Sequence, residues 1–247
     1  MAARHDLTAD PTVQAELVSP RLGTALFART LAELDDAELD GASLLPDWSR
    51  RHVVSHLAYN ARAIARLAEW ARTGVETPMY ESVAVRNQEI ADGAKLTPTA
   101  LRAFFEESAA QLDEAWSTLP TDAWAHPVRA AQGREVLALD TVWMRARELW
   151  VHAVDLAGRA TFADVPAAVV ERLLGDIVRA WTSRGEQAGL ILNVTDSAVL
   201  LQLGDTEAAE AEIVSGTRAA LAEWATGRGT AGVSSTMGNV RPAPRWL

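Results

Sequence analysis

Apolar and polar residues recur with a helical period along most of the chain between residues 20 and 160. Turn signals rich in Gly, Pro and Asp interrupt this pattern and divide it into separate segments. The segments predict helices at about 20–37, 48–73, 81–92, 98–118 and 137–158. Four of these are long enough to form a helical bundle. We expect Ser49 and Thr97 to cap two of the helices, because a hydroxyl can accept from the first free amides.

The pattern changes after residue 158. An amphipathic segment from Asp164 to about Arg184 predicts a further helix. Short apolar runs then predict strands at 189–195, 198–203 and 210–214, followed by a helix at 216–226. This order predicts an α+β fold, with a four-helix bundle in residues 1–160 and a small α/β domain in residues 161–247.

Composition excludes several classes of partner. The chain of 247 residues carries 33 acidic and 23 basic side chains, a net charge of -10. This charge would repel nucleic acids and anionic membranes, so we expect neither as a partner. No apolar run approaches the ~18 residues of a spanning helix and no signal-peptide pattern is visible, so we expect a cytoplasmic protein. The sequence contains no Cys, so any thiol chemistry needs a thiol from outside the chain.

Three of the five His residues fall inside predicted helices. His52 and His56 share the inward face of one helix, and periodicity does not choose between them. Glu148 and His152 lie four residues apart on one face of another helix. One of the two earlier histidines, together with Glu148 and His152, would supply three ligands for zinc with a fourth position open. The alternative is a solvated Glu148–His152 pair and a histidine that only packs in the core.

Two arginines are candidates for binding an anion. Arg228 stands between Gly227 and Gly229, which would let its guanidinium approach a carboxylate closely, although the sequence alone slightly favours a structural turn. The glycines do not have the spacing of a nucleotide-binding loop. Arg86, followed by Asn87, reads by itself as part of a solvated helix face.

At these residues the sequence resembles the mycothiol-dependent maleylpyruvate isomerases, and the resemblance covers nearly the whole chain. It is carried by DWSRRHVVSHLAYNARA at 47–63, TVWMRARELWVHAVDLAG at 141–158, GRGTAGVSST at 227–236 and the closing PAPRWL. The resemblance implies a DinB-like bundle that holds a divalent metal, followed by a small α/β domain that helps to close the active site.

The family's functional residues can be carried over one by one. Its metal ligands fall on His56, Glu148 and His152, which favours His56 over His52, and its functional arginine falls on Arg228. Because the implied substrate has two carboxylates and develops enolate charge, we expect Arg228 to contact it, with Arg86 as a second candidate.

The implied activity is the cis-to-trans conversion of maleylpyruvate to fumarylpyruvate in the gentisate branch of aromatic degradation. The implied cofactors are mycothiol and a divalent metal, for which Zn²⁺ is the expected ion. Addition of a thiolate would make the C=C bond single, rotation would follow, and expulsion of the thiolate would leave the trans product. Coordination to a metal would deprotonate the thiol. The alternatives are a mycothiol S-transferase that acts on electrophiles and a non-catalytic helical binding protein. A monomer is the working expectation.

Overall fold

The fold combines a helical unit with a unit that contains a sheet. A computed structural model describes residues 6–186, 189–197, 201–204 and 211–246. The chain divides into two compact units, residues 1–159 and 160–247. The first is mostly helical and the second contains a mixed sheet and helices, so the predicted α+β class is confirmed. That residues 1–160 and 161–247 are two separate domains stays a prediction.

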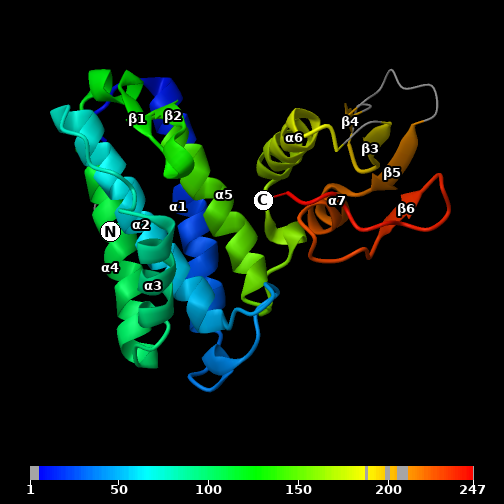
Figure 1. Ribbon diagram of the computed structural model, residues 1–247, viewed down its shortest axis with the longest axis horizontal. Helices are drawn as coiled ribbons and strands as arrows, with labels where there is room; N and C mark the ends of the chain where they lie inside the picture. The colour runs from blue at the N-terminus through cyan, green and yellow to red at the C-terminus, as the bar shows by residue number, and fades with distance from the viewer. Residues whose placement is uncertain (1–5, 187–188, 198–200, 205–210, 247) are drawn as a thin grey trace. The chain divides into compact units, whose positions relative to one another are not determined.

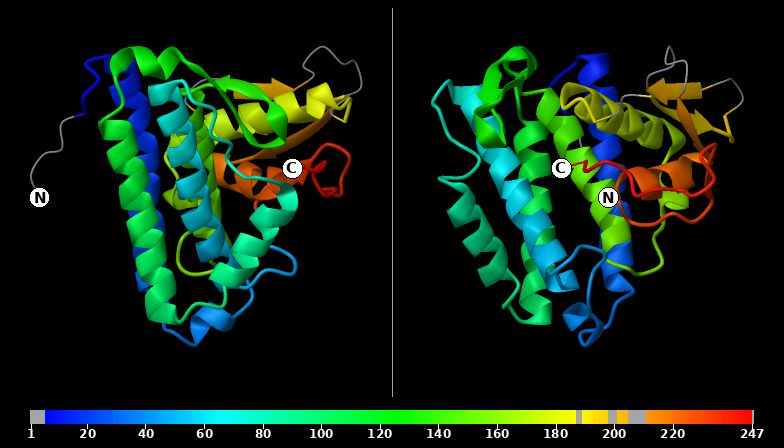
Figure 2. Two further views of the ribbon diagram at one scale, coloured as in Figure 1. Left: turned by 60° about the vertical axis from the view of Figure 1, so that its left-hand side comes forward. Right: turned by 45° about the vertical axis from the view of Figure 1, so that its right-hand side comes forward.

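Four long helices make up most of the first unit: α1 (Pro11–Ala32), α2 (Arg50–Thr73), α4 (Pro98–Ser117) and α5 (Asp140–Asp155). Contacts join α1 to α4, α4 to α2, α2 to α5 and α5 to α1, which closes a four-helix bundle (Figures 1 and 2). A shorter helix, α3 (Val83–Gly93), packs against α2.

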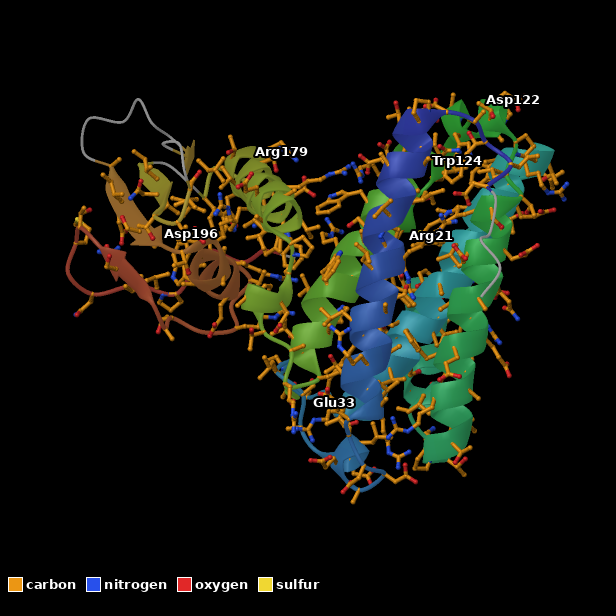
Figure 3. The ribbon with its side chains drawn as sticks, turned by 180° about the vertical axis from the view of Figure 1, so that it is seen from behind. Arg21, Glu33, Asp122, Trp124, Arg179 and Asp196 are labelled. Atoms are coloured by element: carbon orange, nitrogen blue, oxygen red, sulfur yellow. The ribbon has the colours of Figure 1, made fainter. Side chains whose placement is uncertain are left out.

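Short elements connect the long helices. The strands β1 (Pro127–Arg129) and β2 (Glu135–Leu137) form an antiparallel hairpin before α5. The single-turn 3₁₀ helices are η1 (Glu38–Asp40), η2 (Thr121–Ala125) and η3 (Ala131–Gly133). Trp124 of η2, labelled in Figure 3, is buried in the hydrophobic core at one end of the bundle. Among the described residues, no helix combines the length and the apolarity needed to cross a bilayer.

The core of the bundle holds α2 in a fixed orientation. Val53, Leu57, Ile64 and Leu67 follow the helical period and are completely buried. Each such side chain contributes roughly 1.5–3 kcal/mol relative to an exposed one. This burial makes the face of α2 that carries His56 an inward face.

Most predicted helix ends in this unit agree with the structure to within three residues, but neither end of α1 does: the helix ends at Ala32, whereas we expected residue 37. We expected a helix from residue 20, whereas α1 begins at Pro11. Asp10 caps it by accepting a hydrogen bond from the Thr12 backbone N–H at 2.8 Å. Pro20 lies inside the helix, so reading it as a helix start was wrong.

The second unit consists of η4 (Phe162–Asp164), α6 (Ala167–Ser183), β3 (Leu190–Val194), β4 (Leu201–Gly204), β5 (Glu212–Gly216), α7 (Arg218–Ala225) and β6 (Val233–Ser235). The sheet order is β4-β3-β5-β6. The β3–β5 pair is parallel, and the two outer pairs are antiparallel. Both helices contact the sheet, and they contact each other. The strand β6 was not predicted, and residues 198–200 of the predicted strand 198–203 lie outside the described residues.

Candidate metal centre

Packing of α2 against α5 brings three potential ligands together. His56 lies on α2, and Glu148 and His152 lie one turn apart on α5. The Oε2 atom of Glu148 is 2.8 Å from Nε2 of His56 and 3.1 Å from Nε2 of His152. One potential ligand atom from each residue lies within 4.8 Å of the others. The structure therefore brings together the three residues that the sequence suggested as ligands.

The centre is largely buried but keeps a partly exposed side. The His56 residue is 4% exposed, whereas the side chains of Glu148 and His152 retain 18% and 12% exposure. The rings of His56 and His152 are perpendicular, with centroids 4.9 Å apart. The Trp48 ring lies edge-on to His56 at 5.5 Å and shields it. The accessible surface of the centre therefore belongs mainly to Glu148 and His152.

Burial and hydrogen bonding separate the charge states of the two histidines. Burial lowers the pKa of His56 to about 4, so this ring is neutral at neutral pH. Burial opposes charge on His152 as well, but hydrogen bonds with Asp155 and Glu148 raise its pKa to about 9. The hydrogen bonds from His152 and His56 overcome burial at Glu148 and hold its pKa well below the usual value. Without a metal, the centre therefore contains a carboxylate, one imidazolium and one neutral imidazole.

A second carboxylate orients His152. Asp155 is completely buried, and its Oδ2 atom lies 2.7 Å from Nδ1 of His152. The backbone N–H of Leu44 donates to the Asp155 carbonyl at 3.0 Å, which helps to fix this end of α5. We predicted no role for Asp155 from the sequence, although its spacing of three residues from His152 was a usable signal.

His52 is not part of the centre. Its Nδ1 atom lies 2.8 Å from the Ser49 hydroxyl and accepts a hydrogen bond from the Ser49 backbone N–H at 3.2 Å. These contacts belong to the cap at the start of α2. The contacts therefore distinguish the capping residue His52 from the candidate ligand His56, a choice that helical periodicity alone left open.

The donor set fits a divalent metal. Two imidazoles and one carboxylate form a common ligand set for zinc in catalytic sites, where a fourth position stays open. The Nε2 atoms of both histidines and the Oε2 atom of Glu148 converge. The Asp155 carboxylate contacts the other nitrogen of His152, as in metal sites where a second carboxylate orients a ligating histidine. The alternative of a solvent-exposed Glu148–His152 pair does not agree with the structure, because both side chains are largely buried and converge with the buried His56.

Arg86 of α3 lies beside the candidate centre. Its Nη2 atom is 3.4 Å from Nδ1 of His56, and its guanidinium lies 5.9 Å from the centre of the Tyr80 ring. Arg66 lies 6.0 Å from the same ring. Reading Arg86 as part of a solvated helix face was therefore incomplete, because the packing of α3 on α2 turns it toward His56.

Arg228 lies three residues after the end of α7 in the second unit. Its backbone N–H donates to the Glu223 carbonyl at 2.8 Å, and its guanidinium donates to the Thr226 carbonyl. Gly227 has φ 77°, and a Cβ atom at Gly229 would overlap the Glu223 carboxylate. Gly227 thus serves the turn that ends α7, whereas at Gly229 a Cβ atom would displace only the flexible end of Glu223. The anion-binding role of Arg228 stays a prediction.

Comparisons with known proteins agree with this architecture. A family model described as the mycothiol maleylpyruvate isomerase N-terminal domain matches residues 21–157. A crystal structure of the mycothiol-dependent maleylpyruvate isomerase has 45% sequence identity and a TM-score of 0.90, and the match covers 95% of this chain and 97% of that chain. A His-to-Ala mutant of such an isomerase matches with 44% identity, the same TM-score and the same coverage. A comparison with curated proteins finds no match. The chain therefore belongs to the mycothiol-dependent maleylpyruvate isomerase family of enzymes.

Proposed function

We propose that this protein converts maleylpyruvate to fumarylpyruvate, using mycothiol and a divalent metal, with Zn²⁺ as the expected ion. The observation that carries the proposal is the convergence of His56, Glu148 and His152 in a chain so similar to a solved isomerase. The gentisate branch of aromatic degradation belongs to the same proposal and rests on the sequence resemblance. A cytoplasmic location and a monomeric state also belong to it, as expectations from the sequence alone.

The three convergent side chains would hold the metal. His56 is suited to this role because burial keeps its ring neutral, with the pKa lowered to about 4. Asp155 positions His152 through Nδ1, which leaves Nε2 directed toward Glu148. Zn²⁺ held there would supply a Lewis acid that lowers the pKa of a thiol. Trp48 limits the access of water on the His56 side.

The thiol must come from a separate molecule, because none of the 247 residues is Cys. Thiolate addition to a conjugated C=C bond allows rotation about that bond, and elimination of the same thiolate restores the double bond without net oxidation or reduction. The chain's task is to position the two reactants and to exclude water that would hydrate the double bond.

Arginines would bind the carboxylates of the substrate. When Nε2 of neutral His56 serves as a ligand, its Nδ1 carries the proton, and Nδ1 can no longer accept from Arg86. The Arg86 guanidinium would then be available to an anion beside the metal. We assign the second carboxylate contact to Arg228, whose planar guanidinium suits bidentate binding.

The test is an isomerisation assay followed by NMR, with metal-loaded protein and with or without mycothiol. We expect turnover only with mycothiol, and loss of turnover in His56→Ala. His52→Ala is the matched control, because it changes a histidine one turn away that caps α2. A parallel assay supplies mycothiol with an electrophile such as chlorodinitrobenzene. Conjugation without isomerisation would support an S-transferase, and full isomerisation by thiol-free protein would contradict the proposed chemistry.

A further inference from the structure

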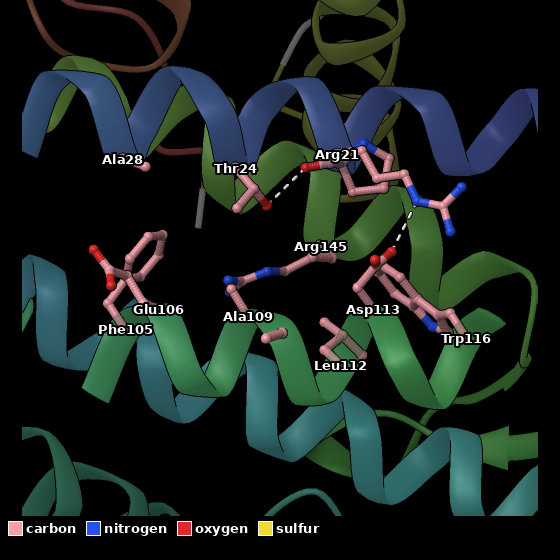
Figure 4. A pocket seen from close by; sticks show the side chains of 12 residues that line it. Arg21, Thr24, Ala28, Phe105, Glu106, Ala109, Leu112, Asp113, Trp116 and Arg145 are labelled. Atoms are coloured by element: carbon pink, nitrogen blue, oxygen red, sulfur yellow. Dashed lines mark hydrogen bonds and ion pairs between the residues drawn. The ribbon is translucent and has the colours of Figure 1, made fainter. Parts of the chain in front are cut away.

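A cavity lies in the helical bundle, between α1 and α4 (Figure 4). Its volume is about 490 Å³, which is within the range of small-molecule sites. Ala28, Phe105, Ala109, Leu112 and Trp116 contribute to its largely apolar wall. From Phe105 to Trp116 the lining covers eleven residue steps of α4, or roughly 16 Å along the helix. The cavity is therefore elongated along the bundle.

Arg145 of α5 also lines this cavity, although the residue is only 1% exposed. Figure 4 shows its side chain extending between α1 and α4. Its Nη1 atom donates to the Leu57 carbonyl and to Oδ1 of Asn60, both at 2.8 Å. Its Nη2 atom is buried and has no hydrogen-bond partner among the described residues. A buried donor without a partner is costly, so this atom points to a missing acceptor.

The charge of Arg145 is not balanced by a contacting carboxylate. Among the described residues, the hydrogen bonds of its guanidinium go to a carbonyl and an amide oxygen, and the charge of Glu148, three residues further along α5, acts on it only without direct contact. Burial lowers the pKa of Arg145 to about 10, which still leaves it charged at neutral pH. An anionic ligand would supply both the counter-charge and the missing acceptor.

The mouth of the cavity limits how many anionic groups the ligand can carry. Arg21 lies there, but its Nε donates to Asp113 at 2.8 Å and its Nη1 donates to Asp6 at 2.9 Å. The exposed Glu106 also lines the cavity. These carboxylates satisfy Arg21 and would repel a second anionic group, so a dicarboxylate does not fit this cavity.

We propose that the α1–α4 cavity is a binding site for an elongated apolar molecule with a single terminal carboxylate, which accepts a hydrogen bond from Nη2 of Arg145. The apolar body would lie along Ala109, Leu112 and Phe105. The cavity lining does not include His56, Glu148 or His152, so this site is distinct from the proposed metal centre, and its binding of a ligand does not depend on the proposed isomerase activity. Arg145 is nevertheless three residues from Glu148 on α5 and is within reach of its charge.

The test measures binding of octanoate and of 1-octanol to the full-length, metal-loaded protein by titration calorimetry. We expect saturable octanoate binding about ten- to a hundred-fold tighter than octanol binding, because octanol lacks the charged acceptor. Ala109→Phe should fill the cavity and abolish octanoate binding, while metal content and isomerase activity stay unchanged. Ala100→Phe is the control, since Ala100 is an exposed residue of the same helix outside the cavity lining.

Arg145→Met should remove the preference for octanoate over octanol while leaving the apolar walls in place. If this variant fails to fold, the Ala109 and Ala100 variants decide the question. Equal affinity for the two probes in the unmodified protein, no binding of octanoate, or octanoate binding that survives Ala109→Phe would overturn the proposal. The last result would place octanoate elsewhere, for example on the metal.

Discussion

Oδ2 of Asp155 lies 2.7 Å from Nδ1 of His152, while Nε2 of the same ring lies 3.1 Å from Glu148. The imidazole is thus held between two carboxylates, one at each nitrogen. Asp155 is completely buried, so a competing hydrogen bond from water is excluded. This arrangement fixes both the orientation of the ring and the nitrogen that faces the proposed metal.

Replacement of Asp155 tests this positioning role. Asp155→Asn keeps the size of the side chain but removes its charge, so we expect about a 10- to 100-fold loss of zinc affinity. Competition with a chelator above pH 9 measures this loss where protons compete less with the metal. Unchanged affinity would show that Asp155 only stabilises the end of α5. Asp164→Asn is a control at a capping carboxylate in the second unit.

The two histidines of α2 give a paired prediction. His56→Ala should lose the metal, because it removes one of three ligands from the candidate centre. His52→Ala should keep the metal and lower the free energy of unfolding by about 1 kcal/mol, since it removes a capping contact. Elemental analysis and thermal unfolding measure both outcomes. Full metal in His56→Ala together with metal loss in His52→Ala would reverse the assignment.

Helical periodicity predicted the helices that carry the site well, because the spacing of apolar residues is repeated over many residues in each helix. The start of α4 was predicted correctly: Thr97 caps it by accepting from the Ala100 backbone N–H at 3.3 Å, and Pro98 follows. Periodicity gave the wrong start for α1, because the helix begins after the capping residue Asp10 and continues through Pro20. It also missed β6, whose three residues are too few to carry an alternating pattern.

The contacts within the candidate site needed tertiary information. The separation of four residues places Glu148 and His152 on one face of a helix, but it does not say which residue of α2 meets them. That choice depends on the packing of α2 against α5, which puts His56 at Glu148 and leaves His52 with Ser49. The approach of Arg86 to His56 likewise depends on the packing of α3 on α2.

Arg228→Lys should retain the metal but lose most of the isomerase activity. A lysine ammonium keeps the charge without the planar pair of donors that binds a carboxylate. Loss of charged hydrogen bonds of about 1.5–3 kcal/mol corresponds to roughly a ten- to hundred-fold fall in rate. Arg179→Lys is the control, at an exposed position of α6 labelled in Figure 3. Wild-type kcat and KM in the Arg228 variant would remove this residue from the mechanism.

Zinc affinity should depend on pH through His152. In the metal-free protein, the pKa of His152 is raised to about 9, so its imidazole is protonated at neutral pH. A ligand must be neutral, so binding displaces about one proton. The apparent association constant should therefore rise about tenfold per pH unit from neutral pH and level off above pH 9. His56 adds no competing proton in this range, because its pKa is lowered to about 4.

Calorimetry in buffers with different ionisation enthalpies counts the protons released by zinc binding. We expect about one proton at pH 7 in the unmodified protein. Asp155→Asn should release fewer, because removal of its carboxylate lowers the pKa of His152 and leaves more of the ring neutral before zinc binds. Zinc affinity that stays constant between pH 7 and 9, with no proton released, would mean that His152 is already neutral or does not bind the metal.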